Sequence, residues 1–221
     1  MENEIRLDSV CYHYGSNTNH VLQNICCSFK HGEVTAIIGP SGSGKTTLLS
    51  IIAGLDIPDN GEIYLNDQLY SSLDLDYLRR EKISMIFQNY NLLPYCTALE
   101  NVSYPMELIG YNQAESEQQA IEYLSLVGID ETKYGRFPSK LSGCEQQRVA
   151  IARALTSGAQ IILADEPTGN LDKENSMKII EILHTLAHNN AYCVIIVTHD
   201  NDIADEADTI YRISNGSLEK Q

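Results

Sequence analysis

The chain has 221 residues, 43% of them hydrophobic, and a formal net charge of −15 at pH 7. This length suits one compact domain with a substantial core. The acidity argues against free nucleic acid as a partner, because neutralising phosphates needs a basic surface. No apolar stretch approaches the roughly 18 residues that span a bilayer, and the N-terminus Met1–Arg6 lacks a signal peptide's basic and apolar regions. We therefore expect a cytoplasmic protein that reaches a membrane only through another chain.

The six cysteines show no metal-binding pattern. None forms a Cys-x-x-Cys pair, and no histidine lies near them at zinc-ligand spacing. Free thiols in a reducing compartment are the expected state.

The first part of the chain reads as strands around one helix. Alternation predicts half-buried strands over residues 4–14 and Val21–Phe29, and the apolar run Val34–Ile38 predicts a buried strand. A helix follows from about Lys45. Further on we expect short strands at Gly61–Leu65 and Gln68–Tyr70, a helix at Asp74–Lys82 and a buried strand at Ile83–Phe87.

The rest of the chain is helical at first and then alternates. Thr97 with Glu100, and Ser142 with Glu145, have the spacing of capping boxes, and Asn112 can cap a helix running to Val127. After residue 157 we expect strands at Ile161–Ala164, Tyr192–Val197 and Thr209–Ile213, with helices at Asn175–His188 and Asp200–Ala207.

These elements predict an α/β fold of the P-loop NTPase (RecA-like) type in one domain, 1–221. Residues 1–88 and 158–221 would form a parallel-sheet nucleotide-binding core with a small antiparallel β subdomain. Residues 89–157 would form an inserted α-helical subdomain.

The stretch Gly39–Thr47 predicts a phosphate site. It reads Gly-Pro-Ser-Gly-Ser-Gly-Lys-Thr-Thr between a buried strand and an opening helix. Glycines let backbone N–H groups approach a phosphate, and the helix adds its positive N-terminal end. The Lys45 ammonium can lie between the β- and γ-phosphates, and the Thr46 hydroxyl can ligate Mg²⁺. The alternative is a glycine-rich turn without a ligand. The candidate triphosphate-binding residues are Gly39, Pro40, Ser41, Gly42, Ser43, Gly44, Lys45, Thr46 and Thr47.

Two carboxylates end the strand Ile161–Ala164. At a strand tip beside the phosphate loop, Asp165 can hold Mg²⁺ through water, and Glu166 can polarise an attacking water. The alternative is that both merely cap the turn before Pro167.

In this order the motifs resemble the ATPase subunits of ABC transporters, over nearly the whole chain. The matching stretches are Gly39–Thr47 (Walker A), Gln88 (Q-loop), Leu141–Arg148 (signature), Ile161–Glu166 (Walker B), Asn170–Asp172 (D-loop) and His199 (switch histidine).

This resemblance implies a head-to-tail homodimer that sandwiches two ATP molecules with Mg²⁺. Ser142, Gly143 and Gln146 of one copy would face the γ-phosphate held by Lys45 of the other. Gln88 would ligate Mg²⁺ and report γ-phosphate occupancy, and Asp172 would lie at the dimer seam. The implied catalytic residues are Glu166, His199, Lys45 and Gln88, and the implied metal ligands are Thr46, Gln88 and Asp165.

The family also has an aromatic residue shortly before the strand that feeds the phosphate loop. Tyr14 is the candidate adenine platform, with Tyr12 as the second choice. The alternative is that both are ordinary strand residues.

Cys144 departs from the signature pattern, which usually has a second glycine there. A cysteine would be strained if its φ had to be positive. Three interpretations stay open: a tolerated natural variant, a weakened site, or an introduced thiol. The weakened-site interpretation predicts that Cys144→Gly raises ATPase activity.

Three stretches resemble the macrolide-exporter, lipoprotein-release and bacitracin-resistance ATPases: Phe87–Pro94, Thr97–Val102 and Asp165–Asp172. The resemblance implies a separate integral-membrane permease, contacted by the loop Asn89–Glu100 beside a coupling groove, and a peripheral place on the inner face of the cell membrane. One alternative is a cell-division ATPase that signals to a cell-wall hydrolase without transport. A soluble ABC protein acting on DNA or ribosomes would need a basic surface, a second ATPase domain or a long coiled coil. A P-loop kinase would need no signature element. The transported substrate and its direction are not written in this subunit.

Overall fold

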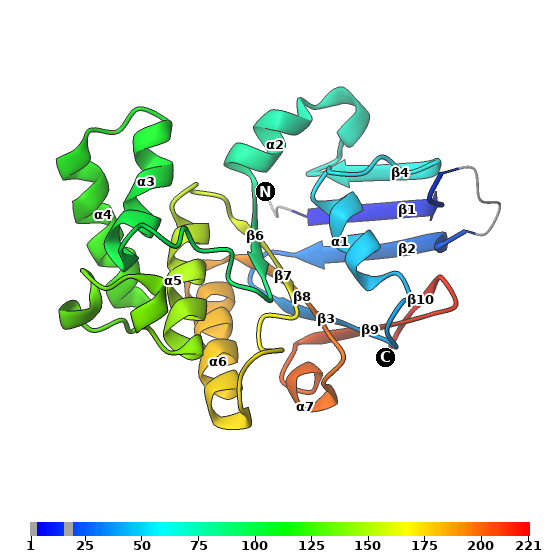
Figure 1. Ribbon diagram of the computed structural model, residues 1–221. Coiled ribbons are helices and arrows are strands. Elements are labelled where there is room, and N and C mark those ends of the chain that lie inside the picture. The colour runs from blue at the N-terminus through cyan, green and yellow to red at the C-terminus, as the bar shows by residue number, and fades with distance from the viewer. Residues whose placement is uncertain (1–3, 16–19) are drawn as a thin grey trace.

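A six-stranded sheet forms the centre of the computed structural model, which describes residues 4–15 and 20–221 (Figure 1). The first three residues of the segment Met1–Arg6, in which we expect no signal peptide, lie outside the described residues. The strand order is β10-β9-β3-β8-β7-β6, with β10 alone antiparallel to its neighbour. The strands β3 and β8 are buried throughout, as a parallel sheet covered on both faces requires. The bounds are β3 Val34–Ile38, β6 Ile83–Phe87, β7 Ile161–Asp165, β8 Cys193–Thr198, β9 Thr209–Ser214 and β10 Ser217–Lys220.

A second, antiparallel sheet has the order β2-β1-β4-β5 and confirms the expected β subdomain (Figure 1). Its strands alternate as the sequence predicts: Ile5 and Leu7 are buried, and Cys27 is buried beside the exposed Cys26. The bounds are β1 Glu4–Tyr12, β2 Leu22–Lys30, β4 Asn60–Leu65 and β5 Gln68–Leu69.

The two faces of the central sheet carry different helices. Alternate residues of β7 separate into two cores: Ile161 and Leu163 pack with α1, while Ile162 and Ala164 pack with α5 and α6. Figure 1 shows α1 to the right, towards the antiparallel sheet, and α5 to the left. The phosphate-loop helix and the signature helix therefore lie on opposite faces. The bounds are α1 Lys45–Ile52, α5 Gly143–Leu155 and α6 Lys173–Asn190.

Between β6 and β7 the described chain is helical, as expected (Figure 1, left). The hydroxyl of Thr97, the amide oxygen of Asn112 and the hydroxyl of Ser142 each accept a bond from a backbone N–H in the first turn of their helix. These three predicted caps are confirmed. The remaining helices are α2 Leu75–Glu81, α3 Ala98–Leu108, α4 Gln113–Leu126 and α7 Asn201–Ala204, with 3₁₀ turns at Tyr70–Ser72, Glu131–Lys133 and Pro138–Lys140.

Several elements differ from the sequence prediction by one or two residues at an end; Tyr70, for example, begins a 3₁₀ turn and does not belong to the strand expected at Gln68–Tyr70. Two differences are larger. The helix α7 ends at Ala204 rather than Ala207, because the chain turns there so that Asp208 can accept the N–H of Val34 at 2.7 Å. The strand β10 was not predicted. It is a short polar edge strand, although Asn215-Gly216 before it is a strong hairpin signal and both residues have positive φ.

None of the helices in the described ranges combines the length and the apolarity needed to cross a bilayer.

Candidate functional site

The phosphate loop connects β3 to α1 in the predicted geometry. Gly42 and Gly44 have φ of 77° and 104°, in the left-handed region that favours glycine. A Cβ on Gly39 would lie 2.3 Å from the carbonyl oxygen of Ile213, so only glycine fits there. The first turn of α1 has no side-chain cap and no acidic residue. Its free N–H groups and positive end are thus available to an anion.

Two buried polar side chains of this loop, Lys45 and Ser43, can donate hydrogen bonds to a phosphate. The Lys45 side chain is almost wholly buried, and its Nζ donates to the carbonyl oxygens of Gly39 at 2.8 Å and Pro40 at 3.0 Å. The Ser43 hydroxyl is buried and has no partner among the described residues. Buried polar groups are nearly always paired, so an unpaired one in a glycine-rich loop is itself a sign of a bound group. A phosphate would supply acceptors to both.

A hydroxyl and a carboxylate meet at the entrance to α1. The Thr46 Oγ1 donates to Asp165 Oδ1 at 3.4 Å. Burial and the neighbouring Glu166 raise the pKa of Asp165, although Thr46 and Lys45 oppose the shift. A cation would relieve this penalty on the charged form. Hard oxygen ligands beside a phosphate site fit Mg²⁺, which keeps several waters. In the described part of the chain no three His, Cys, Asp or Glu side chains form a metal cage.

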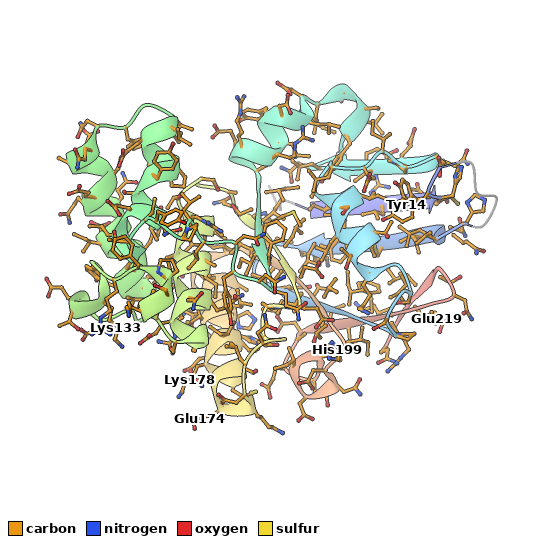
Figure 2. All side chains as sticks on the ribbon, viewed as in Figure 1. Tyr14, Lys133, Glu174, Lys178, His199 and Glu219 are labelled. Carbon is orange, nitrogen blue, oxygen red and sulfur yellow. The ribbon has the colours of Figure 1, made fainter. Side chains whose placement is uncertain are left out.

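The Glu166 carboxylate lies against His199. Both carboxylate oxygens are 2.9 Å from His199 Nδ1. The Glu166 backbone has a φ of 49°, unusual for a non-glycine residue, and its N–H is tied to the carbonyl of Val197 at 2.9 Å. Such strain concentrates at functional sites. Figure 2 shows His199 near the middle of the lower edge, close to α7. The pair joins the ends of β7 and β8, as two neighbouring parallel strands allow.

The Q-loop and the D-loop are joined directly. Asn170 Nδ2 donates to the carbonyl of Gln88 at 2.9 Å. The side-chain amide of Gln88 packs on Gly169. A Cβ on Gly169 would lie only 2.8 Å from Gln88 Nε2. A few residues on, Asp172 caps α6 by accepting the N–H of Asn175 at 3.0 Å, and these local bonds lower the pKa of Asp172. Contacts between adjacent residues therefore connect Gln88 to the segment that contains Asp172, the residue predicted at the dimer seam.

Sequence reasoning missed the residue that holds the Q-loop in shape. The Arg153 guanidinium donates to the carbonyl oxygens of Tyr90 at 3.0 Å and Asn91 at 2.7 Å. Both of these residues have positive φ. An arginine in the last turn of the signature helix gave no signal of this, since the hydrogen bond joins residues more than 60 positions apart in the sequence.

The structure separates the two tyrosines considered for adenine. Tyr14 lines a cavity of about 250 Å³ together with Gly42, Lys45 and Thr47, and its hydroxyl bonds Thr47 Oγ1 at 2.9 Å. Tyr12 does not line that cavity and is half-buried beside it. The position favours Tyr14 as the platform, and its role stays a prediction.

The signature helix α5 has a different N-terminus. Ser142 and Glu145 form a complete capping box, with Ser142 N–H donating to Glu145 at 2.8 Å and Glu145 N–H donating to Ser142 at 3.3 Å. Glu145 also pairs with Lys133, which Figure 2 shows at the far left, across the molecule from Tyr14. Gly143 lies against the Tyr90 hydroxyl, and Gln146 donates to the carbonyl of Leu141 at 3.1 Å.

Cys144 lies inside α5 and is not among the described residues with positive φ. The backbone strain considered from the sequence is therefore absent. Its side chain is buried with the core that α5 shares with α6. The thiol thus packs into the core, and the residue keeps the helical backbone conformation at the start of α5.

The structure brings most of the predicted residues to the C-terminal ends of β3, β7 and β8. The phosphate loop, Asp165, Glu166 and His199 follow those strands directly, and Tyr14 is bonded to the loop. It places Ser142, Gly143 and Gln146 at the end of a helix on the other face of the sheet. A strand followed by a glycine loop with a buried lysine, together with a carboxylate at the end of β7 that reaches the loop through Thr46, defines a P-loop nucleoside triphosphatase.

Comparison with known proteins identifies the kind of triphosphatase. The family described as "ABC transporter" matches residues 22–169, so the chain belongs to the ABC transporter family and is an ABC ATPase domain. A macrolide export ATP-binding/permease protein of Mannheimia succiniciproducens is 45% identical over 92% of this chain and 32% of that protein. A lipoprotein-releasing system ATP-binding protein of Saccharophagus degradans is 40% identical over 95% of this chain and 93% of the relative.

A solved dimer of the ABC transporter cassette MJ0796, from Methanocaldococcus jannaschii, is 40% identical and has a TM-score of 0.85 over 98% of both chains. The same cassette is also known as a dimer in a post-hydrolysis state bound to ADP and Pi.

Proposed function

We propose that this chain is the ATP-hydrolysing subunit of a transporter of the export or lipoprotein-release type, and that it works as a head-to-tail homodimer. One observation carries the proposal: α1 and α5 pack on opposite faces of one sheet. The signature residues Ser142, Gly143 and Gln146 do not line the cavity beside the phosphate loop of their own chain, so they are free to meet the loop of a second copy. The dimers solved for the related cassette support a dimer.

Within one half of the site, each group has a chemical task. Lys45 and the loop N–H groups bind the β- and γ-phosphates of ATP. Thr46, Asp165 and Gln88 would hold Mg²⁺, which neutralises charge on the phosphates during transfer. Glu166 accepts a proton from the attacking water, and His199, bonded to both oxygens of Glu166, orients the water and the γ-phosphate. Tyr14 stacks on the adenine.

The second copy completes the site. Its Ser142 hydroxyl, the small Gly143 and the Gln146 amide meet the γ-phosphate at the end of α5, and its Asp172 lies at the seam. Loss of the γ-phosphate removes this contact, so hydrolysis lets the two copies separate.

The predicted helical subdomain, residues 89–157, would transmit this change to a membrane permease. A groove of about 350 Å³ lies between it and the core, lined by residues that include Leu55, Phe87, Pro105 and Arg153. Arg153 also holds the Q-loop. A cytoplasmic helix of the permease in this groove would contact both subdomains and place the chain at the inner face of the membrane.

The relatives support the branch. They are named for macrolide export and lipoprotein release, and the former carries its permease in the same polypeptide. The cell-division alternative draws no support from these names.

A complementation experiment tests the composite site. Lys45→Ala and Ser142→Glu each damage both sites of a homodimer, but a mixed dimer keeps one intact site, built from Lys45 of one chain and Ser142 of the other. Random mixing makes half of the dimers mixed, each with one of two sites intact, so we expect about a quarter of the wild-type ATPase rate.

The matched control mixes Lys45→Ala with Glu166→Gln. These residues belong to the same half, so no mixed dimer has an intact site and the rate stays at the level of the single variants. A site contained in one chain predicts no recovery in either mixture, and that result contradicts the proposal.

A further inference from the structure

The ring of Tyr12 packs against the ring of Tyr14. The two rings meet edge to face, with centroids 5.1 Å apart and an interplanar angle of 87°. This is a favoured arrangement for aromatic pairs, because the positive ring edge faces the negative ring surface. Tyr14 is 53% exposed, so few other groups restrain it. Tyr12 is half-buried as the last residue of β1 and packs on the core shared with α1.

The Tyr12 hydroxyl is anchored at the far end of α1. It donates to Asp56 Oδ1 at 3.3 Å, and burial together with Asp56 raises the pKa of Tyr12. Asp56 lies in the turn after α1, where its N–H reaches back to the carbonyl of Ser50. A second bond, from the N–H of Asp59 to the carbonyl of Cys11 at 2.9 Å, ties this turn to β1.

The Tyr14 hydroxyl is held at the near end of the same helix, where it bonds Thr47 Oγ1 at 2.9 Å. Thr47 is the third residue of α1. The Tyr12–Tyr14 pair is therefore attached to both ends of the helix that starts at the phosphate loop. An aromatic platform fixed in this way loses less conformational freedom when a base stacks on it.

We propose that Tyr12, anchored by Asp56, is a positioning residue for nucleotide binding: it sets the orientation of the Tyr14 ring relative to the phosphate loop. Tyr12 does not touch the nucleotide. This inference rests on the proposed role of Tyr14 as the adenine platform.

The test compares affinities for ATP and for inorganic tripolyphosphate by calorimetry. We expect Tyr12→Leu to weaken ATP binding by roughly 3–10-fold and to leave tripolyphosphate binding unchanged, because only the base needs the platform. Tyr12→Phe keeps the ring and should lose about 2-fold or less. In steady-state ATPase assays Tyr12→Leu should raise KM and leave kcat unchanged.

Tyr64→Leu is the matched control. Tyr64 is a half-buried tyrosine of the same sheet whose hydroxyl also bonds a carboxylate, that of Glu62, but its ring lies under Arg6 and not against Tyr14. We expect it to leave ATP affinity unchanged.

The outcomes separate the two ideas. If Tyr14→Ala weakens ATP binding and Tyr12→Leu does not, the inference is wrong and the platform stands. An equal loss for ATP and tripolyphosphate in Tyr12→Leu shows a general disturbance of the loop and also overturns it. If Tyr14→Ala leaves ATP affinity unchanged, the platform itself fails and the inference with it.

Discussion

In the proposed dimer, the N-terminus of α1 in one copy and the N-terminus of α5 in the other meet the same phosphate, and the two ends are built in opposite ways. The N-cap residue of α1 is Gly44, and this helix has no side-chain cap and no acidic residue in its first turn. The N-cap residue of α5 is Ser142, and this helix has a complete capping box and Glu145 in its first turn. The first backbone N–H groups of α1 have no side-chain partner, whereas at α5 the capping box already uses the N–H groups of Ser142 and Glu145.

This difference suggests which end binds the anion first. Because the α1 end has free N–H groups, a buried Lys45 and a Ser43 hydroxyl without a partner among the described residues, we expect it to bind phosphate in the isolated chain. We expect the α5 end, with a carboxylate in its first turn, to meet a phosphate only when a second copy brings one together with its cations. On this proposal, nucleotide binding precedes dimerisation as a separate event.

Removing the base should give the largest effect and leave both helix ends untouched. We expect Glu166→Gln to bind ATP and to lose about 10²–10⁴-fold in hydrolysis rate, the usual worth of a positioned base. Light scattering with ATP and Mg²⁺ should then show a trapped dimer. Turnover near the wild-type rate would show that Glu166 is not the base.

Lys45→Ala tests phosphate binding at the N-terminus of α1. The variant should bind ATP about 1.5–3 kcal/mol more weakly, since it loses hydrogen bonds from a charged donor. Titration of the monomer with ATP measures this loss. Unaltered affinity would contradict the assignment of the loop.

Cys144→Gly examines the α5 end without changing charge. Because Cys144 has helical backbone and a buried side chain, glycine should lower the free energy of unfolding by about 1 kcal/mol without raising the ATPase rate. Denaturant unfolding and steady-state hydrolysis measure the two quantities. A clear rise in rate would restore the weakened-site interpretation that the sequence left open.

Glu145→Gln tests whether the negative charge at the α5 end weakens its contact with phosphate, and it has the smallest expected effect. Glutamine can keep the capping box but removes the negative charge that pairs with Lys133. In the Glu166→Gln background we expect the ATP-bound dimer to become tighter by about 0.3–1 kcal/mol, the usual size of a charge effect at a helix end. Sedimentation across a concentration series measures it. A weaker dimer would show that Glu145 supports the helix end more than it repels phosphate.

Local patterns predicted much of this molecule. The apolar runs before Gly39 and Asp165 became β3 and β7, and the caps at Thr97, Asn112 and Ser142 formed as expected, because each depends on residues within one turn or one strand. The polar edge strand β10 escaped prediction, since its residues carry little apolar alternation.

The sequence by itself determined the phosphate loop, the carboxylates that end β7, and the family to which the chain belongs, because these are short stretches whose spacing carries the chemistry. Only the tertiary structure decided that α1 and α5 lie on opposite faces, that Arg153 holds the Q-loop, and that Tyr14 rather than Tyr12 lines the cavity beside the phosphate loop. Each of these depends on contacts between residues distant along the chain, and such contacts are set by how the sheet is packed on its two sides.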